Sequence, residues 1–193
     1  MAGASMKDIK LRIKSVESTM QITKAMELVA SSKLRKAKER QERCRPYFMG
    51  LKQTLESIET ATNDFSSPYQ QQREIKKRCL IVIAGDRGLA GGYNSNVFKS
   101  VQPMLEEGSV CVLPIGKRTV DFFARNGIEI LTTEFAEAAS VSVSDCFTIS
   151  NLITKGYLNG QYDEVSVVYT RFVSMLTQTP AHDVLLPLEK LEG

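Results

Sequence analysis

Apolar residues in the first thirty positions recur at intervals of three and four. Such steps place side chains on one face of a helix, whereas a half-buried strand would alternate at every second residue. Two stripes follow this spacing, and the second is displaced around the helix axis from the first: Ile9, Ile13, Val16 and Met20, then Ile22, Met26 and Val29. The pattern predicts an amphipathic helix in this region.

A further stripe alternates steps of four and three as far as residue 62. Its members are Ala37, Gln41, Cys44, Phe48, Leu51, Leu55, Ile58 and Thr62. An average step of 3.5 residues is the spacing of a coiled-coil seam. Because the stripe shifts between the two halves, we expect the supercoil to relax or change hand there.

These stripes belong to one helix that we expect from residue 7 to about residue 61, with start signals at Ser5 and Asp8. Pro46 lies inside it and removes one backbone hydrogen bond. Two helices could meet there, but the seam continues through Pro46, so we favour a bent, continuous helix. About 55 helical residues extend roughly 80 Å, whereas the remaining 131 residues would have a radius of gyration of ~14 Å. Much of the seam therefore needs another helix, from this chain or a different one.

Residues 63–75 are polar and rich in turn-forming types, which predicts a linker. Beyond it, apolar runs of strand length alternate with helical patterns. We expect strands at 79–84, 110–115, 128–131, 165–171 and 184–188, and helices at 94–105, 117–125 and 144–158. The second of these helices would end at Asn126-Gly127, and the third would begin near Ser144 or Asp145.

Strands that alternate with helices predict a mostly parallel sheet. The expected fold class is therefore α/β, with a long N-terminal coiled-coil helix in residues 1–62 and a Rossmann-like, mostly parallel α/β domain in residues 76–193.

A glycine-rich turn follows the first expected strand and comprises Gly85, Asp86, Arg87, Gly88, Gly91 and Gly92. A turn between a strand and a helix can hold a phosphate. Here the glycines do not match G-x-G-x-x-G, and the lysine of a Walker-type loop is missing. Asp86 would also repel a phosphate. We interpret the glycines as permitting a tight turn and close packing, and we predict no cofactor.

Charge is distributed unevenly along the chain. Residues 1–62 contain 13 Lys and Arg against 7 Asp and Glu, whereas the rest contains 12 against 15. This asymmetry predicts two structural units with different partners. No apolar run approaches the ~20 residues of a membrane-spanning helix, and the N-terminus resembles neither a signal peptide nor a transit peptide.

Cysteine and histidine usage argues against metal and nucleophilic chemistry. Cys44, Cys79, Cys111 and Cys146 form no C-x-x-C pair, so zinc and thioredoxin-type sites are disfavoured. We expect these thiols to be buried and reduced. His182 is the only histidine, and we expect it in a loop, without a ligand or base role. The sequence therefore predicts no catalytic and no metal-binding residues.

A basic cluster precedes Pro46 in the expected helix. Its members are Lys33, Arg35, Lys36, Lys38, Arg40, Arg43 and Arg45, interrupted by Glu39 and Glu42. Three interpretations remain open: a solvated helix face, a nucleic-acid contact as in basic-region zippers, and an acidic protein surface. The sparsely charged segment QITKAMELVASSKLRKA before it is unlike a nucleic-acid-binding arm.

Two segments have a residue order specific enough to indicate a family: IKSVESTMQITKAMELVASSKLRKA at 13–37 and GDRGLAGGYNSN at 85–96. Together they resemble the gamma subunit family of F-type ATP synthases, in its bacterial form, and the resemblance extends over most of residues 6–190.

The resemblance implies a non-catalytic rotor-stalk subunit. In that family the N-terminal helix pairs with a C-terminal helix inside a ring of three alpha and three beta subunits, and the beta subunits hold the catalytic sites. The α/β domain would lie against the epsilon subunit and the proton-driven membrane c-ring. Rotation would push each beta subunit through open and closed states. The resemblance implies a peripheral protein at the cytoplasmic face of the bacterial plasma membrane. It implies no nucleic-acid partner.

By the same resemblance, a set of residues on the helix would contact the alpha/beta ring. Thr23, Lys24, Met26 and Glu27 would face loops of the beta subunit, and Lys33, Arg35 and Lys36 would meet their acidic lip. Family members continue for about another helix beyond LEKLEG, so the seam lacks its usual partner here. We therefore expect the lone helix to self-associate.

Overall fold

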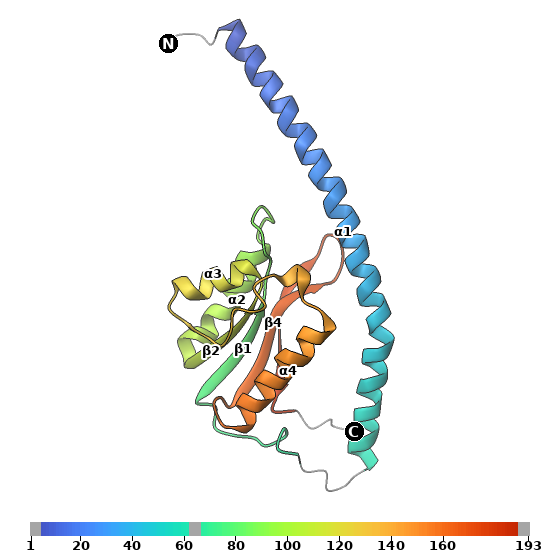
Figure 1. The fold of residues 1–193 in the computed structure, drawn as a ribbon, viewed down its shortest axis with the longest axis vertical. Helices are drawn as coiled ribbons and strands as arrows, with labels where there is room; N and C mark the ends of the chain where they lie inside the picture. The colour runs from blue at the N-terminus through green and yellow to red at the C-terminus, as the bar shows by residue number, and fades with distance from the viewer. Residues whose placement is uncertain (1–4, 62–66, 189–193) are drawn as a thin grey trace. The chain divides into compact units, whose positions relative to one another are not determined.

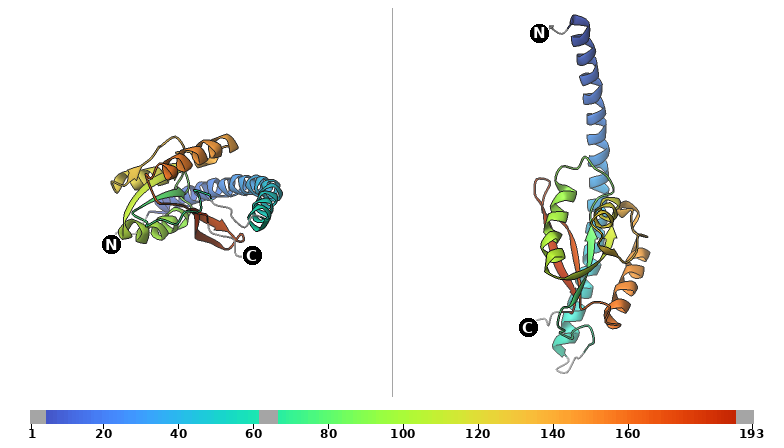
Figure 2. Two further views of the ribbon diagram at one scale, coloured as in Figure 1. Left: turned by 90° about the horizontal axis from the view of Figure 1, so that it is seen from below. Right: turned by 90° about the vertical axis from the view of Figure 1, so that its left-hand side faces the viewer.

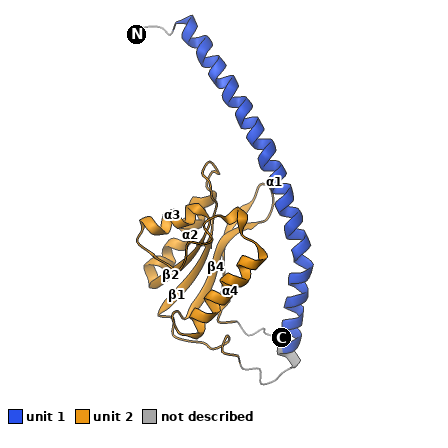
Figure 3. Cartoon of the chain, in the orientation of Figure 1, with its two compact units in different colours: residues 1–63, 193 blue, residues 64–192 orange. Residues whose placement is uncertain are grey.

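The computed structural model describes residues 5–61 and 67–188. The chain divides into two compact units, residues 1–63 together with residue 193, and residues 64–192, which Figure 3 colours separately. The first unit contains helix α1, and the second contains a sheet with its covering helices.

Helix α1 runs without interruption from Met6 to Ala61. The Asp8 carboxylate accepts a hydrogen bond from the Ser5 backbone N–H at 3.2 Å, and the Ser5 hydroxyl accepts one from the Lys7 N–H at 3.3 Å. These bonds satisfy N–H groups that have no partner inside the helix. Pro46 lies within the helix and does not end it, which confirms a continuous helix. The axis of α1 is curved (Figure 1).

The second unit is a five-stranded sheet with the strand order β3-β2-β1-β4-β5. Its strands are β1 Lys77–Ile83, β2 Ser109–Ile115, β3 Glu129–Ile130, β4 Glu164–Phe172 and β5 Gln178–Leu186. Strands β1, β2, β3 and β4 pair in parallel, and β5 runs antiparallel to β4. The predicted α/β class with a mostly parallel sheet is confirmed.

Helices cover both faces of this sheet (Figure 2). They are α2 Tyr93–Glu107, α3 Lys117–Arg125 and α4 Val143–Leu158, and a short 3-10 turn η1 spans Ala138–Ser140. Cys79 and Ile81 of β1 belong to the core cluster beneath α4, whereas Leu80 and Val82 belong to the cluster beneath α2 and α3. A strand buried on both faces is therefore apolar at every position rather than at alternate ones.

Element boundaries differ from the prediction where long-range pairing or capping sets them. Strand β3 has only two residues, and β5 begins at Gln178 rather than near residue 184. Helix α4 is capped by Ser142, and its third residue, Asp145, accepts a hydrogen bond from the Ser142 N–H in return. Helix α3 ends at Arg125, and Gly127 follows with a φ of 65°.

Candidate partner-binding surfaces

The apolar stripes of α1 are open to solvent. Among its described side chains none is buried, and the exposed fractions are 53% for Ile13, 54% for Met26 and 63% for Leu55. Each aliphatic side chain of this size contributes roughly 1.5–3 kcal/mol when fully buried. The exposed stripes are therefore suited to contact with another helix or protein surface.

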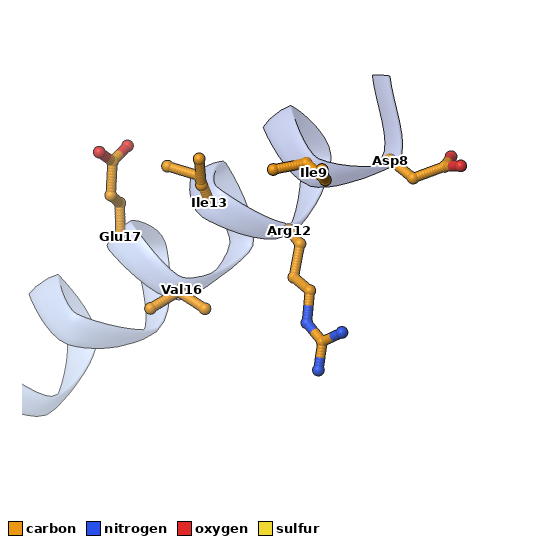
Figure 4. Close-up of a pocket in the computed structure, with 6 residues that line it drawn as sticks. All are labelled: Asp8, Ile9, Arg12, Ile13, Val16 and Glu17. Atoms are coloured by element: carbon orange, nitrogen blue, oxygen red, sulfur yellow. The ribbon is translucent and has the colours of Figure 1, made fainter. Parts of the chain in front are cut away.

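The first stripe borders an open hollow of ≈ 450 Å³ near the start of α1. Figure 4 shows its six lining residues, Asp8, Ile9, Arg12, Ile13, Val16 and Glu17, all of them from this helix. The side chains of Arg12 and Glu17 point to opposite sides of the helix (Figure 4). A hollow lined by a single helix holds no small molecule tightly, so it indicates a contact surface rather than a ligand site.

The predicted beta-facing residues lie on the next turns of α1. Thr23, Lys24 and Glu27 border a second open hollow, of ≈ 620 Å³, and Met26 is not among the residues that line it. The Thr23 hydroxyl donates to the Thr19 carbonyl at 2.9 Å. The Thr23 hydroxyl is therefore satisfied within the helix, whereas Lys24 and Glu27 keep exposed charged groups that are available to a partner.

The basic cluster divides into two faces. On one face Arg35 pairs with Glu39 at 3.7 Å, and Lys38 pairs with Glu42 at 3.9 Å. Exposed pairs of this kind contribute only about 0.3–0.5 kcal/mol each. Other cations form no ion pair with the described part of the chain: Lys33, Lys36, Arg40 and Arg43, which follow one another at steps of three, four and three, and Arg45, which lies on the same side as Lys38. The predicted contact residues Lys33 and Lys36 thus lie on the unpaired face, whereas the charge of Arg35 is internally compensated.

Asp86 fixes the glycine-rich turn by bonds to distant backbone. Its carboxylate accepts hydrogen bonds from the N–H groups of Lys117 at 3.2 Å, Ala138 at 2.8 Å and Ala139 at 3.1 Å. Carboxylate–amide bonds are among the stronger hydrogen bonds in proteins. Asp86 therefore joins this turn to the start of α3 and to η1.

Asn94 closes the same turn from the other side. Its side-chain oxygen accepts from the Gly85 N–H at 2.8 Å, and its amide donates to the Arg87 carbonyl at 3.1 Å. Gly88 lies against the Arg118 guanidinium, and Gly91 has a φ of 55°. At Gly88, Gly91 and Gly92, small size or positive φ keeps the turn compact. The sequence alone did not indicate the role of Asn94, since its partners lie seven and nine residues away.

The cysteine prediction is correct for one pair and wrong for the other. Cys79 and Cys111 are buried register partners on β1 and β2, but Cys44 and Cys146 are exposed. Cys44 is a solvent-exposed residue of α1, and Cys146 is a solvent-exposed residue of α4, so neither side chain packs in a hydrophobic core. Hydrogen bonding with Cys111 and burial raise the pKa of the Cys79 thiol, which keeps it protonated.

The predicted loop position of His182 is also wrong, because the residue lies in β5 and is exposed. Across residues 5–61 and 67–188, no cluster of three His, Cys, Asp or Glu side chains could hold a metal ion. Within the same residues, no helix has the length and hydropathy of a membrane span.

Fold and surface together define a class: a long helix with exposed apolar stripes, joined to a Rossmann-like α/β domain. The family model described as ATP synthase matches residues 5–193. The ATP synthase gamma chain of Ruminococcus albus is 44% identical over 194 residues, which cover 98% of this chain and 68% of that protein. The gamma chain of Alkaliphilus metalliredigens is 45% identical, with 99% and 66% covered. The chain belongs to the ATP synthase gamma chain family.

The chain spans about two thirds of the length of these relatives, 68% and 66%. Two solved structures share its fold. The central stalk and c-ring of the Tetrahymena thermophila mitochondrial ATP synthase gives a TM-score of 0.59 at 24% identity, covering 86% of this chain and 72% of that one. The rotor of the Euglena gracilis mitochondrial enzyme gives 0.54 at 14% identity, covering 92% and 61%.

Proposed function

We propose that this chain forms part of the central rotor stalk of an F-type ATP synthase. In this role it couples rotation of a proton-driven membrane ring to conformational change in catalytic beta subunits and contributes no catalytic residue itself. The observation that carries the proposal is the 56-residue helix α1, whose apolar stripes are exposed along its length.

A rotating shaft must transmit torque without binding any one partner tightly. A curved helix with an asymmetric surface presents different side chains to each neighbour at each orientation. Only a difference in interaction free energy between two states shifts their populations. The pairing of Arg35 and Lys38 with glutamates on one face, and the unpaired cations on another, provide such an asymmetry.

The proposed partners follow from the two units. Residues 1–62 form the shaft half that contacts the alpha and beta subunits, through Thr23, Lys24, Met26 and Glu27 and through Lys33, Arg35 and Lys36. Residues 63–75 act as a linker. The domain at 76–193 contacts the epsilon subunit and the c-ring, at the cytoplasmic face of a bacterial plasma membrane.

Reconstitution tests the proposal directly. The chain, and a version extended by the C-terminal helix of a relative, are mixed with alpha and beta subunits and purified by size. We expect a stoichiometric complex that hydrolyses ATP, with higher activity for the extended version because its seam is paired.

A matched pair of variants tests whether α1 makes the contact. Lys33→Glu with Lys36→Glu reverses two unpaired charges among the proposed contact residues, whereas Lys38→Glu with Lys52→Glu makes the same change at two cations that pair with glutamates and lie outside the proposed contact set. We expect the first variant to lower complex formation more strongly. If neither version of the chain forms a complex with alpha and beta subunits, the proposed function is wrong.

A further inference from the structure

The segment at residues 67–75, which precedes β1, is fixed to the α/β domain at several points. Two hydrogen bonds form within it: the Tyr69 N–H donates to the Ser67 hydroxyl at 3.3 Å, and the Gln70 N–H donates to the Ser67 carbonyl at 2.9 Å. The Tyr69 side chain packs against the core cluster beneath α4. Residues 67–75 therefore belong to the domain rather than to a free connection.

Arg73 makes two contacts with Tyr157, a wholly buried residue near the end of α4, where the segment passes that helix (Figure 1). The Arg73 guanidinium donates a hydrogen bond to the Tyr157 carbonyl at 3.0 Å, and its central carbon lies 4.5 Å from the centre of the Tyr157 ring. The last carbonyl groups of a helix and the face of an aromatic ring both attract a cation. The Tyr157 hydroxyl donates in return to the Gln71 carbonyl at 3.3 Å. The segment thus binds Tyr157 at its ring, its carbonyl and its hydroxyl.

The same segment is bonded to the residues that follow β5. The Leu188 N–H donates to the Tyr69 carbonyl at 2.6 Å. Next to the segment, the Asp163 carboxylate accepts the N–H groups of Lys76 and Lys77 at the start of β1. The chain before β1 and the chain after β5 are therefore held together at one site on the domain.

A segment fixed in this way can transmit a turning force. Only residues 62–66 lie between Ala61, the last residue of α1, and the fixed segment. When a chain joins two bodies, a load passes between them only as far as the attachment at each end holds. At one end the chain is part of the hydrogen-bonded helix α1, and at the other end it is held by the contacts of Tyr69 and Arg73.

We propose that residues 67–75 form a torque attachment, in which Arg73 and Tyr157 fix the α/β domain to the connection from α1 so that the two units turn together. The proposal rests on the proposed function, because only a rotating shaft places a load on this segment. Arg73 is a positioning residue, and it acts through Tyr157 and α4. A connection of the same length without these contacts would twist under load before the domain followed.

Single-molecule rotation measures the stiffness of the torque attachment. The full chain is assembled with alpha and beta subunits, the beta subunits are fixed to a surface, and a bead is attached to Cys146, an exposed thiol of α4. Cys44, which is also exposed, is replaced by serine so that a single site is labelled. We expect the bead to turn during ATP hydrolysis, and its angular spread during pauses reports the torsional stiffness.

Matched variants test the role of Arg73. Arg73→Ala should widen the angular spread about twofold, because it removes both contacts with Tyr157. Arg125→Ala removes an exposed arginine from the end of α3 and should leave the spread unchanged. A loss of stability alone would lower the fraction of molecules that assemble, but not the stiffness of those that rotate. If Arg73→Ala does not assemble, Arg73→Lys takes its place and should also widen the spread, because lysine lacks the planar group that stacks and donates at once.

Hydrogen exchange of the free chain tests the attachment apart from rotation. Arg73→Ala should accelerate exchange of the Leu188 N–H about tenfold, because the Tyr69 carbonyl that accepts it loses its fixed position. Arg125→Ala should leave this exchange unchanged. Equal exchange in the parent and in Arg73→Ala would show that Arg73 does not fix the segment, and would overturn the proposal.

The rotation outcomes separate the torque attachment from the proposed function. Normal rotation with the same angular spread in the parent and in Arg73→Ala overturns the torque attachment alone, and so does equal widening by Arg125→Ala. A parent chain that does not assemble with alpha and beta subunits, or that assembles without rotating, overturns both.

Discussion

At the residue scale, single positions hold segments together that lie far apart in the sequence. Gly116 is the clearest case. It joins β2 to α3 with a φ of 103°, and a Cβ atom there would collide with the backbone carbonyl oxygen of Ala84. Its N–H also donates to the Phe135 carbonyl at 3.1 Å. Neither the conformation nor the space permits a side chain.

Replacing Gly116 by alanine should destabilise the α/β domain by about 2–4 kcal/mol, because it combines backbone strain with overlap of main-chain atoms. Near-UV circular dichroism of tyrosine during urea unfolding measures this, since five of the six tyrosines lie outside α1. Gly108→Ala is the control: its φ is 178° and the space around it is open, so its effect should stay within about 0.5 kcal/mol. Equal effects of the two substitutions would contradict the role given to Gly116.

At the scale of elements, carboxylates fix where segments begin. The Asp163 carboxylate accepts the N–H groups of Lys76 at 2.9 Å and Lys77 at 3.0 Å, at the start of β1. The bond from the Lys76 backbone, then that from Lys77 and the nearby positive charges of Arg73 and Lys76, lower the pKa of Asp163 below its ordinary 3.8. A lowered pKa adds stability that is present above the unfolded-state value and is lost as the pH falls through the folded-state value.

Asp163→Asn should therefore lower stability at neutral pH by about 1 kcal/mol, a value reduced by the exposure of the group. It should also reduce the loss of stability on acidification below about pH 4. Urea midpoints measured from about pH 7 down to about pH 2 test both effects. Glu134→Gln, at an exposed position, should keep the pH dependence of the parent, and a parallel shift of the Asp163→Asn profile at every pH would contradict this account.

Helix α4 depends on a capping box between Ser142 and Asp145. The Asp145 carboxylate accepts from the Ser142 hydroxyl and N–H, both at 2.7 Å, and these bonds lower the pKa of Asp145. Ser142→Ala should cost about 1 kcal/mol. Ser144→Ala, two residues further on, should lower the stability less, because the Ser144 hydroxyl is not part of the capping box. The two urea midpoints give the comparison.

At the scale of the whole molecule, the exposed stripes of α1 predict association. Leu51, Leu55 and Ile58 are 48%, 63% and 45% exposed on one face, and a second copy could bury them as a coiled coil. Sedimentation equilibrium should show a concentration-dependent oligomer. Leu55→Lys should shift it towards monomer, whereas Gln53→Lys, on the opposite side of α1, should not. A parent chain that sediments as a monomer with α1 fully helical would contradict this expectation.

The local pattern of apolar and polar residues was enough to predict most of the helices and strands. The apolar run at 79–84 predicted β1 within one or two residues, because a strand buried on both faces needs apolar side chains throughout. The periodicity of residues 9–58 predicted α1, and the Asn126-Gly127 signal predicted the end of α3. The motifs at 13–37 and 85–96 also predicted the family correctly, because a motif is recognised from the order of its residues and needs no knowledge of tertiary contacts.

The sequence by itself thus determined the helix, the parallel core and the family, because each depends on short-range order along the chain. Tertiary structure alone decided which groups meet across 30 to 90 residues. It placed Asp86 against Ala138, Asp163 against Lys76, and Cys79 beside Cys111. It also extended β5 beyond the predicted strand, since pairing with β4 supplies hydrogen bonds that no local pattern records.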